Sequence, residues 1–124
     1  MSNVLEHQTR QLMHRLNIQP QPVREEQYVQ VSITAIDAAS VVGFRRREED
    51  GPFTGWEIVA TTDVPESARY GYYSVRELAA LRPAWLVGLQ LPTGWAFRFD
   101  GNTLVDCVSD KKVTLPVNLR VEVS

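Results

Sequence analysis

The side chains that most often carry out nucleophilic catalysis are scarce in this sequence. It has one cysteine, Cys107, and two histidines, His7 and His14. Serine or cysteine catalysis needs a histidine within hydrogen-bonding reach of the nucleophile, and both histidines fall in an N-terminal helical pattern, far along the chain from Cys107. This weighs weakly against such a catalyst, because folding can bring distant residues together. We interpret the histidines as solvated helix residues and Cys107, which lies in a strand pattern, as core packing.

The sequence also contains no motif for binding a metal ion or a nucleotide. His7 and His14 are seven residues apart, which in a helix is about 10 Å and too far for both to bind one ion. The lone cysteine forms no CxxC or Cys/His cluster of the kind that binds zinc, and the sequence has neither a P-loop nor a GxGxxG motif. We therefore expect no metal, no cofactor and no enzymatic activity, and an enzyme or a small-ligand-binding domain is the least favoured class.

Charged and aromatic residues in expected turns and loops are candidates for binding another protein. Arg45-Arg46-Arg47 is followed directly by Glu48-Glu49-Asp50, which either forms a charged edge strand with a solvated turn or presents carboxylates to a basic partner. Paired carboxylates also serve glycoside hydrolysis, but neighbours on one turn rarely face the same cleft. Tyrosine is enriched among the residues that dominate binding energy at interfaces. The predicted partner-binding residues are Glu48, Glu49, Asp50, Asp63, Glu66, Tyr70, Tyr72 and Tyr73.

Composition describes an ordinary folded domain. The 124 residues are 44% hydrophobic, with 13 Lys+Arg against 15 Asp+Glu, which allows a sizeable core and argues against disorder. The net charge of −2 provides no basic footprint for direct nucleic-acid binding. The longest apolar run, residues 84–89, is far shorter than the about 20 residues that a membrane helix needs. The N-terminus has no secretory-signal pattern, so with a single cysteine we expect a cytoplasmic protein.

Two helices are predicted to position these residues. Apolar residues at helical spacing indicate an amphipathic helix over residues 3–16, which we expect to dock on its own domain. Pro20 and Pro22 predict an extended connection up to residue 26. A capping box formed by Ser74 and Glu77 begins a second, short helix that ends before Pro83.

The remaining elements are predicted as strands. Alternating patterns indicate strands at about residues 28–34, 41–47, 55–60, 95–99, 103–108 and 117–123, while residues 61–73 read as irregular. Pro116 suits the start of a strand or an edge strand. The prediction is a single α+β domain over residues 1–124, with an antiparallel sheet of five to six strands, an N-terminal helix and one short central helix. Residues 1–26 form the helix and linker of this prediction, and residues 27–124 its core.

Three short motifs follow one another through the middle of the chain. The first is Val42-Gly43-Phe44-Arg45-Arg46-Arg47-Glu48-Glu49 with Gly55-Trp56-Glu57-Ile58 after it, the second Gly71-Tyr72-Tyr73-Ser74 ahead of a helix containing Leu78, and the third Gly94-Trp95-Ala96-Phe97-Arg98. In this order and spacing, over about residues 42–102, they resemble the bacterial family known as immunity protein 33. The long acidic loop of that family is represented here only by Asp63 and Glu66, with Arg69 close by.

The resemblance implies a small, non-enzymatic cytoplasmic protein encoded beside a polymorphic toxin, such as a type VI secretion effector. Such a protein binds the toxin domain and blocks it in the producing cell. A nuclease toxin has a basic substrate surface, and carboxylates with tyrosines would complement it. The alternative is another interaction module, a secretion-system adaptor or effector chaperone that docks through its N-terminal helix. The sequence leaves the oligomeric state open.

Overall fold

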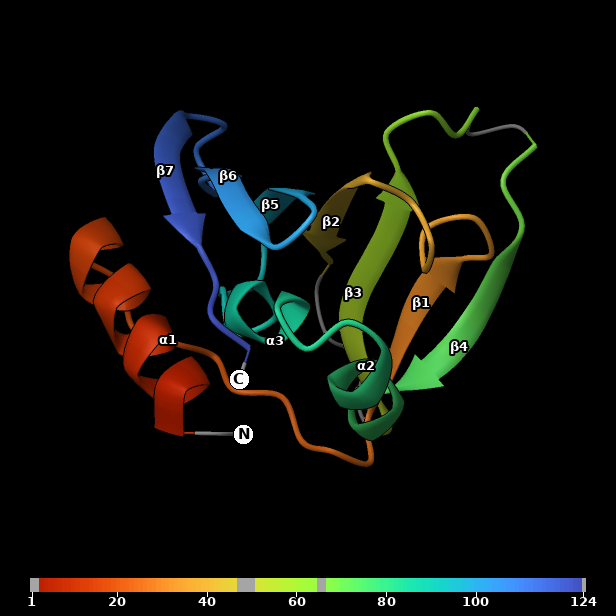
Figure 1. Cartoon of the computed structure of the whole chain (residues 1–124), viewed down its shortest axis with the longest axis horizontal. Coiled ribbons are helices and arrows are strands. Elements are labelled where there is room, and N and C mark those ends of the chain that lie inside the picture. The colour runs from red at the N-terminus through yellow and green to blue at the C-terminus, as the bar shows by residue number, and fades with distance from the viewer. Residues whose placement is uncertain (1–2, 47–50, 65–66, 124) are drawn as a thin grey trace.

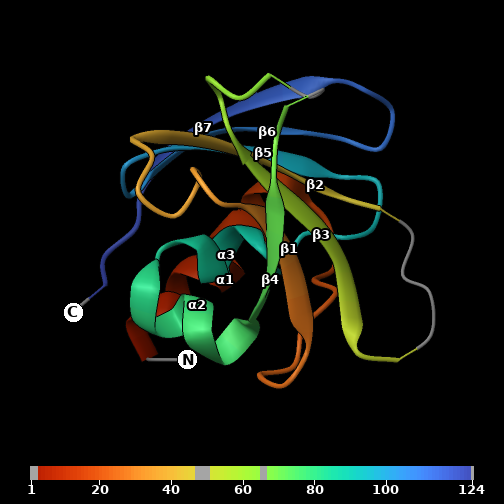
Figure 2. The same cartoon turned by 90° about the vertical axis from the view of Figure 1, so that its right-hand side faces the viewer.

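The computed structural model describes residues 3–46, 51–64 and 67–123. Within them the chain forms three helices and one seven-stranded sheet with the strand order β4-β1-β3-β2-β5-β6-β7. The sheet is strongly curved, and the helices lie on its concave side (Figures 1 and 2). The helices are α1 (Asn3–Leu16), α2 (Val75–Leu81) and α3 (Trp85–Gly88). The strands are β1 (Tyr28–Ser32), β2 (Ser40–Arg45), β3 (Phe53–Ala60), β4 (Tyr70–Ser74), β5 (Ala96–Asp100), β6 (Thr103–Val108) and β7 (Thr114–Arg120).

The α+β class is confirmed, but the sheet is mixed and larger than predicted. Strand β3 forms the expected hairpin with β2 and also lies beside β1, so it separates the two strands that precede it. The pairing of β1 with β3 is parallel, with Val31 opposite Ile58. A purely antiparallel sheet of five to six strands was wrong, because strand alternation shows where strands are but not which strand is inserted between two others.

Strand β4 and helix α3 are the two elements that the sequence patterns missed. Residues 70–74 were expected to be mostly irregular, yet they pair with β1 in an antiparallel ladder that places Tyr72 opposite Gln30. Tyrosine favours strands, and the partner strand supplies the order that this short segment lacks alone. The apolar run that ends at Leu89 forms the one-turn helix α3, whose four residues are all buried.

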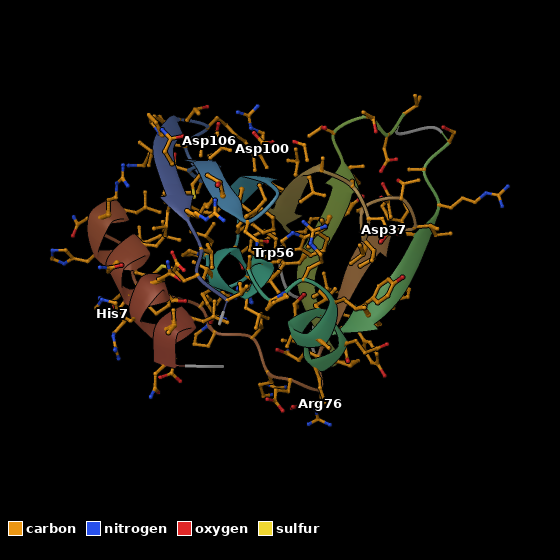
Figure 3. The ribbon with its side chains drawn as sticks, in the orientation of Figure 1. His7, Asp37, Trp56, Arg76, Asp100 and Asp106 are labelled. Atoms are coloured by element: carbon orange, nitrogen blue, oxygen red, sulfur yellow. The ribbon has the colours of Figure 1, made fainter. Side chains whose placement is uncertain are left out.

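Helix α3 lies at the centre of the core. The Trp56 side chain points from β3 towards it (Figure 3), and the Trp56 Nε1 donates to the Leu89 carbonyl at 2.9 Å. The Phe97 ring lies 4.9 Å from that of Trp56. Gly43 on β2 is required here, because a Cβ at this position would overlap the Phe97 ring. The alternate residues of the central strands thus close the concave face around α3.

Helix α1 covers one end of the sheet. Its apolar side includes Leu5, Leu12 and Met13, all buried, so the prediction that this helix docks on its own domain is confirmed. Gln8 donates to the Arg120 carbonyl at 3.0 Å and accepts from the Glu122 N–H at 2.9 Å. The backbone edge of β7 is therefore bonded by side chains of α1, beside which it lies in Figure 1.

Candidate protein-binding face

The convex side of the sheet, which we call the outer face, carries the candidate site. In β3 the even residues from Thr54 to Ala60 are buried and the odd ones are more exposed, so odd residues such as Glu57 point outward. The registers of β1 and β4 bring Tyr28, Gln30 and Tyr72 to the same side. None of the three helices lies on this side of the sheet (Figure 2).

Three aromatic rings gather on this face, across strands β4, β1 and β3. The rings of Tyr28 and Phe53 lie 6.2 Å apart, and those of Phe53 and Tyr72 lie 5.4 Å apart. Their exposed fractions are 41%, 45% and 59% for Tyr28, Phe53 and Tyr72. They line a shallow depression of about 260 Å³, which we call the aromatic hollow, together with Gln30, Arg46, Gly55, Trp56 and Glu57. Contacting aromatic side chains that remain exposed are typical of interaction surfaces.

Glycine at position 55 shapes the floor of the aromatic hollow. Gly55 has a positive φ of 87°, and a Cβ there would overlap the Arg46 carbonyl oxygen. The Arg46 N–H donates to the Gly55 carbonyl at 2.8 Å, which fixes the two strands at this point. A larger residue at position 55 would therefore disrupt the hairpin at the floor of the hollow.

A polar group borders the aromatic hollow. The Arg46 guanidinium lies 2.9 Å from the Glu57 carboxylate, and the same carboxylate acts on the Tyr70 hydroxyl. Burial raises the pKa of Tyr70, and the hydrogen bond to Glu57 and the charge of that carboxylate raise it further. Tyr70 therefore stays a neutral hydrogen-bond donor at physiological pH, and Glu57 is the charged partner that Arg46 and Tyr70 share.

The predicted tyrosines are divided between the two faces of the sheet. Tyr70 and Tyr72 belong to the outer face, whereas Tyr73 points to the concave side and packs against the core. Strand alternation places Tyr72 and Tyr73 on opposite faces, and a segment predicted to be irregular gives no basis for that assignment. Whether a partner contacts any of the three stays a prediction. The predicted Glu48, Glu49, Asp50 and Glu66 lie outside the described residues.

The Asp63 carboxylate forms hydrogen bonds within its own chain. Its carboxylate accepts hydrogen bonds from the Ser32 hydroxyl at 2.6 Å, from the Thr34 hydroxyl and from the Ala60 N–H at 2.9 Å. These bonds, with the two hydroxyls contributing most, hold the pKa of Asp63 below its ordinary value of 3.8. Both carboxylate oxygens are thus engaged in joining the turn after β1 to the turn after β3, and the role of Asp63 in partner binding stays a prediction.

Comparison with known protein families identifies the domain type. A family described as Imm33-like domain matches residues 8–110. The chain belongs to the Imm33-like domain family. This confirms the resemblance to immunity protein 33 and extends it from the middle of the chain into α1 at one end and past β6 at the other. No curated protein and no solved structure matches the chain.

In this Imm33-like domain, Arg45 is a core residue. An edge strand was one interpretation of the basic triplet, and it was wrong, because β2 lies in the middle of the sheet. The Arg45 side chain is 0% exposed and donates to four backbone carbonyls. These carbonyls belong to Gln21, Thr54, Leu89 and Leu91, at 2.6, 3.1, 3.3 and 2.9 Å. The Arg46 side chain points to the outer face and pairs with Glu57. These two neighbours in the triplet therefore have different structural roles.

The residues first considered for catalysis are separated in the Imm33-like domain. His7 lies on the outer side of α1 and points away from the sheet (Figure 3). Cys107 is fully buried in β6, and burial, followed by the charge of Asp106, raises the pKa of its thiol to about 12. Among the described residues, no three His, Cys, Asp or Glu side chains group closely enough to hold a metal ion. No helix of residues 3–46, 51–64 and 67–123 is both long and apolar enough to cross a bilayer.

Four residues of the Imm33-like outer face were missed as candidates: Tyr28, Arg46, Phe53 and Glu57. The signal was present as period-two alternation through Phe53, Gly55 and Glu57. This alternation did not identify Phe53, because the predicted strand begins only near Gly55. The sequence also does not show which strand is the parallel neighbour of β3. Without that neighbour, Tyr28 and Phe53 cannot be recognised as adjacent.

Proposed function

We propose that this Imm33-like domain is an immunity protein that binds a cognate toxin stoichiometrically through the aromatic hollow and neutralises it without catalysis. The observation that carries the proposal is the contact among three exposed aromatic rings on a sheet face that the helices leave open. Large rings held on strands lose little conformational freedom on binding, so they are efficient anchors.

The polar group beside the aromatic hollow supports the same interpretation. Arginine and tyrosine are enriched at the energetic centres of interfaces, and Arg46 and Tyr70 both lie beside Glu57 at the border of the aromatic hollow. Preorganised polar groups pay less of the ordering cost of association. In the sequence, Glu48, Glu49 and Asp50 connect Arg46 to the strand that carries Phe53. Their carboxylates are proposed to speed association with a basic partner.

A nuclease effector of a type VI or related secretion system is the proposed kind of toxin, and the cytoplasm of the producing cell the proposed place of inhibition. Such a toxin has a basic substrate surface, which suits the predicted carboxylates. The adaptor or effector-chaperone alternative required the N-terminal helix as a docking element. The apolar side of α1 is already buried against its own chain, which favours the inhibitor.

The proposal is tested with the toxin encoded beside the gene for this chain. Co-expression of the wild-type chain should restore growth, and the Phe53→Ala/Tyr72→Ala double variant should fail to do so. Loss of two central aromatic anchors should weaken binding by about 100-fold or more. Leu81→Ala removes a side chain that is 49% exposed on α2 and serves as the matched control; it should bind like wild type.

The outcomes separate the function from the site. If the wild-type chain neither binds the toxin nor restores growth, the proposed function is wrong. If it does both and the double variant performs equally well at an unchanged thermal midpoint, the toxin uses another surface.

A further inference from the structure

One edge of the sheet offers unpaired backbone groups in a regular pattern. The Ile33 N–H donates to the Arg69 carbonyl at 2.8 Å and the Val75 N–H to the Gln27 carbonyl at 2.9 Å. In an antiparallel ladder, hydrogen-bonded and non-hydrogen-bonded pairs alternate. The intervening register therefore directs the N–H and carbonyl groups of Tyr70 and Tyr72 away from β1. In the described part of the chain, no residue bonds these outward groups.

At the opposite edge of the sheet, strand β7 is protected against the addition of another strand. The outward groups of β7 and the residues that follow it are bonded by Gln8, and Arg15 donates to the Val117 carbonyl at 2.6 Å. Pro116 lies in the same strand, opposite Asp106, at an outward position where a missing N–H costs no bond to β6. A proline and a covering helix are both devices that prevent strand addition.

None of these devices protects β4 in the described residues. It contains no proline and no lysine, and Figure 1 shows it at the end of the sheet with no helix beyond it. The Tyr72 side chain of β4 also lines the aromatic hollow. The open edge and the hollow are therefore one continuous surface.

We propose that the toxin partner adds an extended strand to the free edge of β4. The added strand exchanges backbone hydrogen bonds with Tyr70 and Tyr72 and lays one apolar side chain against the Tyr72 ring on the outer face. This mode of binding combines main-chain bonds, which supply affinity, with side-chain contacts, which supply selectivity. The inference rests on the proposed function, since it names how the toxin is held.

A second copy of this chain is a poorer occupant of the edge. The Ser74 N–H is already taken by the Glu77 side chain in the capping box of α2. Each copy would then contribute only the outward groups of Tyr70 and Tyr72, giving four hydrogen bonds across the two-fold axis. Stable interfaces typically have about ten. The pairing of two copies adds only the side chains beside the shared edge, whereas the proposed interface with the toxin also includes the aromatic hollow.

Residue-resolved amide hydrogen exchange tests the proposal, using the isolated chain and its complex with the purified toxin domain encoded beside it. The amides of Tyr70 and Tyr72 should exchange rapidly in the isolated chain and about tenfold or more slowly in the complex. The amides of Gly71 and Tyr73, which bond β1, should be slow in both. A complex that leaves the Tyr70 and Tyr72 amides unprotected overturns strand addition while leaving the proposed function intact.

Two other outcomes also contradict the proposal. Protection of Tyr70 and Tyr72 that grows with the concentration of the isolated chain would assign the edge to a second copy. Absence of any complex would refute the proposed function itself, and strand addition with it.

A pair of variants isolates the backbone contribution. Tyr72→Ala and Tyr72→Pro both remove the ring, but only proline also removes the outward N–H, which bonds nothing in β1. Tyr72→Pro should bind the toxin domain about fivefold more weakly than Tyr72→Ala. Equal affinities at equal thermal midpoints would show that this N–H is not used. If the proline variant fails to fold, the exchange experiment on the wild-type chain still decides.

Discussion

Replacing Arg45 with methionine is expected to destabilise the domain far more than any change at its neighbour Arg46. The Arg45 guanidinium joins three parts of the chain, since it donates to carbonyls of Gln21 in the linker, Thr54 at the start of β3, and Leu91 after α3. It also lies 5.8 Å from the centre of the Trp56 ring. Methionine has a similar apolar length but no hydrogen to donate.

The magnitude follows from the carbonyls that lose their donor. The Leu89 carbonyl keeps its bond from Trp56 Nε1, which leaves the carbonyls of Gln21, Thr54 and Leu91. A buried acceptor without a donor costs about 1–3 kcal/mol, and the part-buried Gln21 carbonyl costs the least. Methionine avoids the cost of burying a charge, which offsets part of the loss. The free energy of unfolding should fall by about 3 kcal/mol.

Urea and thermal unfolding measure this difference. A loss of about 3 kcal/mol corresponds to a fall of about 10 °C in the thermal midpoint of a domain of this size. Arg45→Lys should fall between wild type and Arg45→Met, because an ammonium group cannot span the same carbonyls. Arg46→Ala is the adjacent control; its side chain is 70% exposed in the ion pair with Glu57, so it should cost less than about 0.5 kcal/mol.

The reasoning about Arg45 fails if Arg45→Met and Arg46→Ala unfold with the same free energy. That result would mean that water replaces the guanidinium at the three carbonyls, and that Arg45 is not what holds the linker containing Gln21 to the sheet. If Arg45→Met does not fold, the comparison is made between Arg45→Lys and Arg46→Ala, which should still differ by about 1 kcal/mol or more.

Three further predictions test other parts of the structure. Cys107, buried and with its thiol pKa raised to about 12, should react with a disulfide reagent only as the protein unfolds, and rapid labelling of the folded chain would contradict this. The folded pKa of Asp63 is lowered, so its contribution to stability is present above its unfolded pKa and lost as the pH falls through the lower folded value. In urea titrations at acid pH, the free energy of unfolding of Asp63→Asn should therefore depend less on pH than that of wild type. An unchanged pH profile would contradict the stabilising role of the Asp63 carboxylate. The Gln8→Ala/Arg15→Ala variant frees backbone groups of the β7 edge that these two side chains bond and should self-associate in light-scattering measurements, whereas a monomer as stable as wild type would show that these two side chains do not protect that edge.

The sequence patterns predicted the elements of the fold well where local physics decides them. The capping box at Ser74 and Glu77 forms as expected, with the Glu77 N–H bonded to the Ser74 hydroxyl at 3.0 Å. The helix over residues 3–16 and the β2–β3 and β5–β6 hairpins are also confirmed. Each of these signals comes from residues close together in the chain. Strand β4 has no such signal, because its order comes from β1, about forty residues earlier.

The candidate site was harder to predict for the same reason. Tyr72 was selected for its residue type and its expected loop, and it does lie on the outer face, although in a strand. Its two aromatic neighbours, Tyr28 and Phe53, come from β1 and β3. These strands are adjacent only because β3 is inserted beside β1 in a parallel arrangement. A contact that depends on the order of strands cannot be derived from spacing along the chain.

The distribution of burial explains how a binding surface can coexist with a stable fold here. The core is closed by α3 and by inward residues such as Trp56, which are nearly inaccessible. Tyr28, Phe53 and Tyr72 remain 41–59% exposed, so their side chains contribute less to the core and can be substituted at a smaller cost in stability. The free edge of β4 depends on backbone groups, which most substitutions leave unchanged. Side-chain recognition on the outer face can therefore be altered while the β4 edge, and the fold that presents it, stay the same.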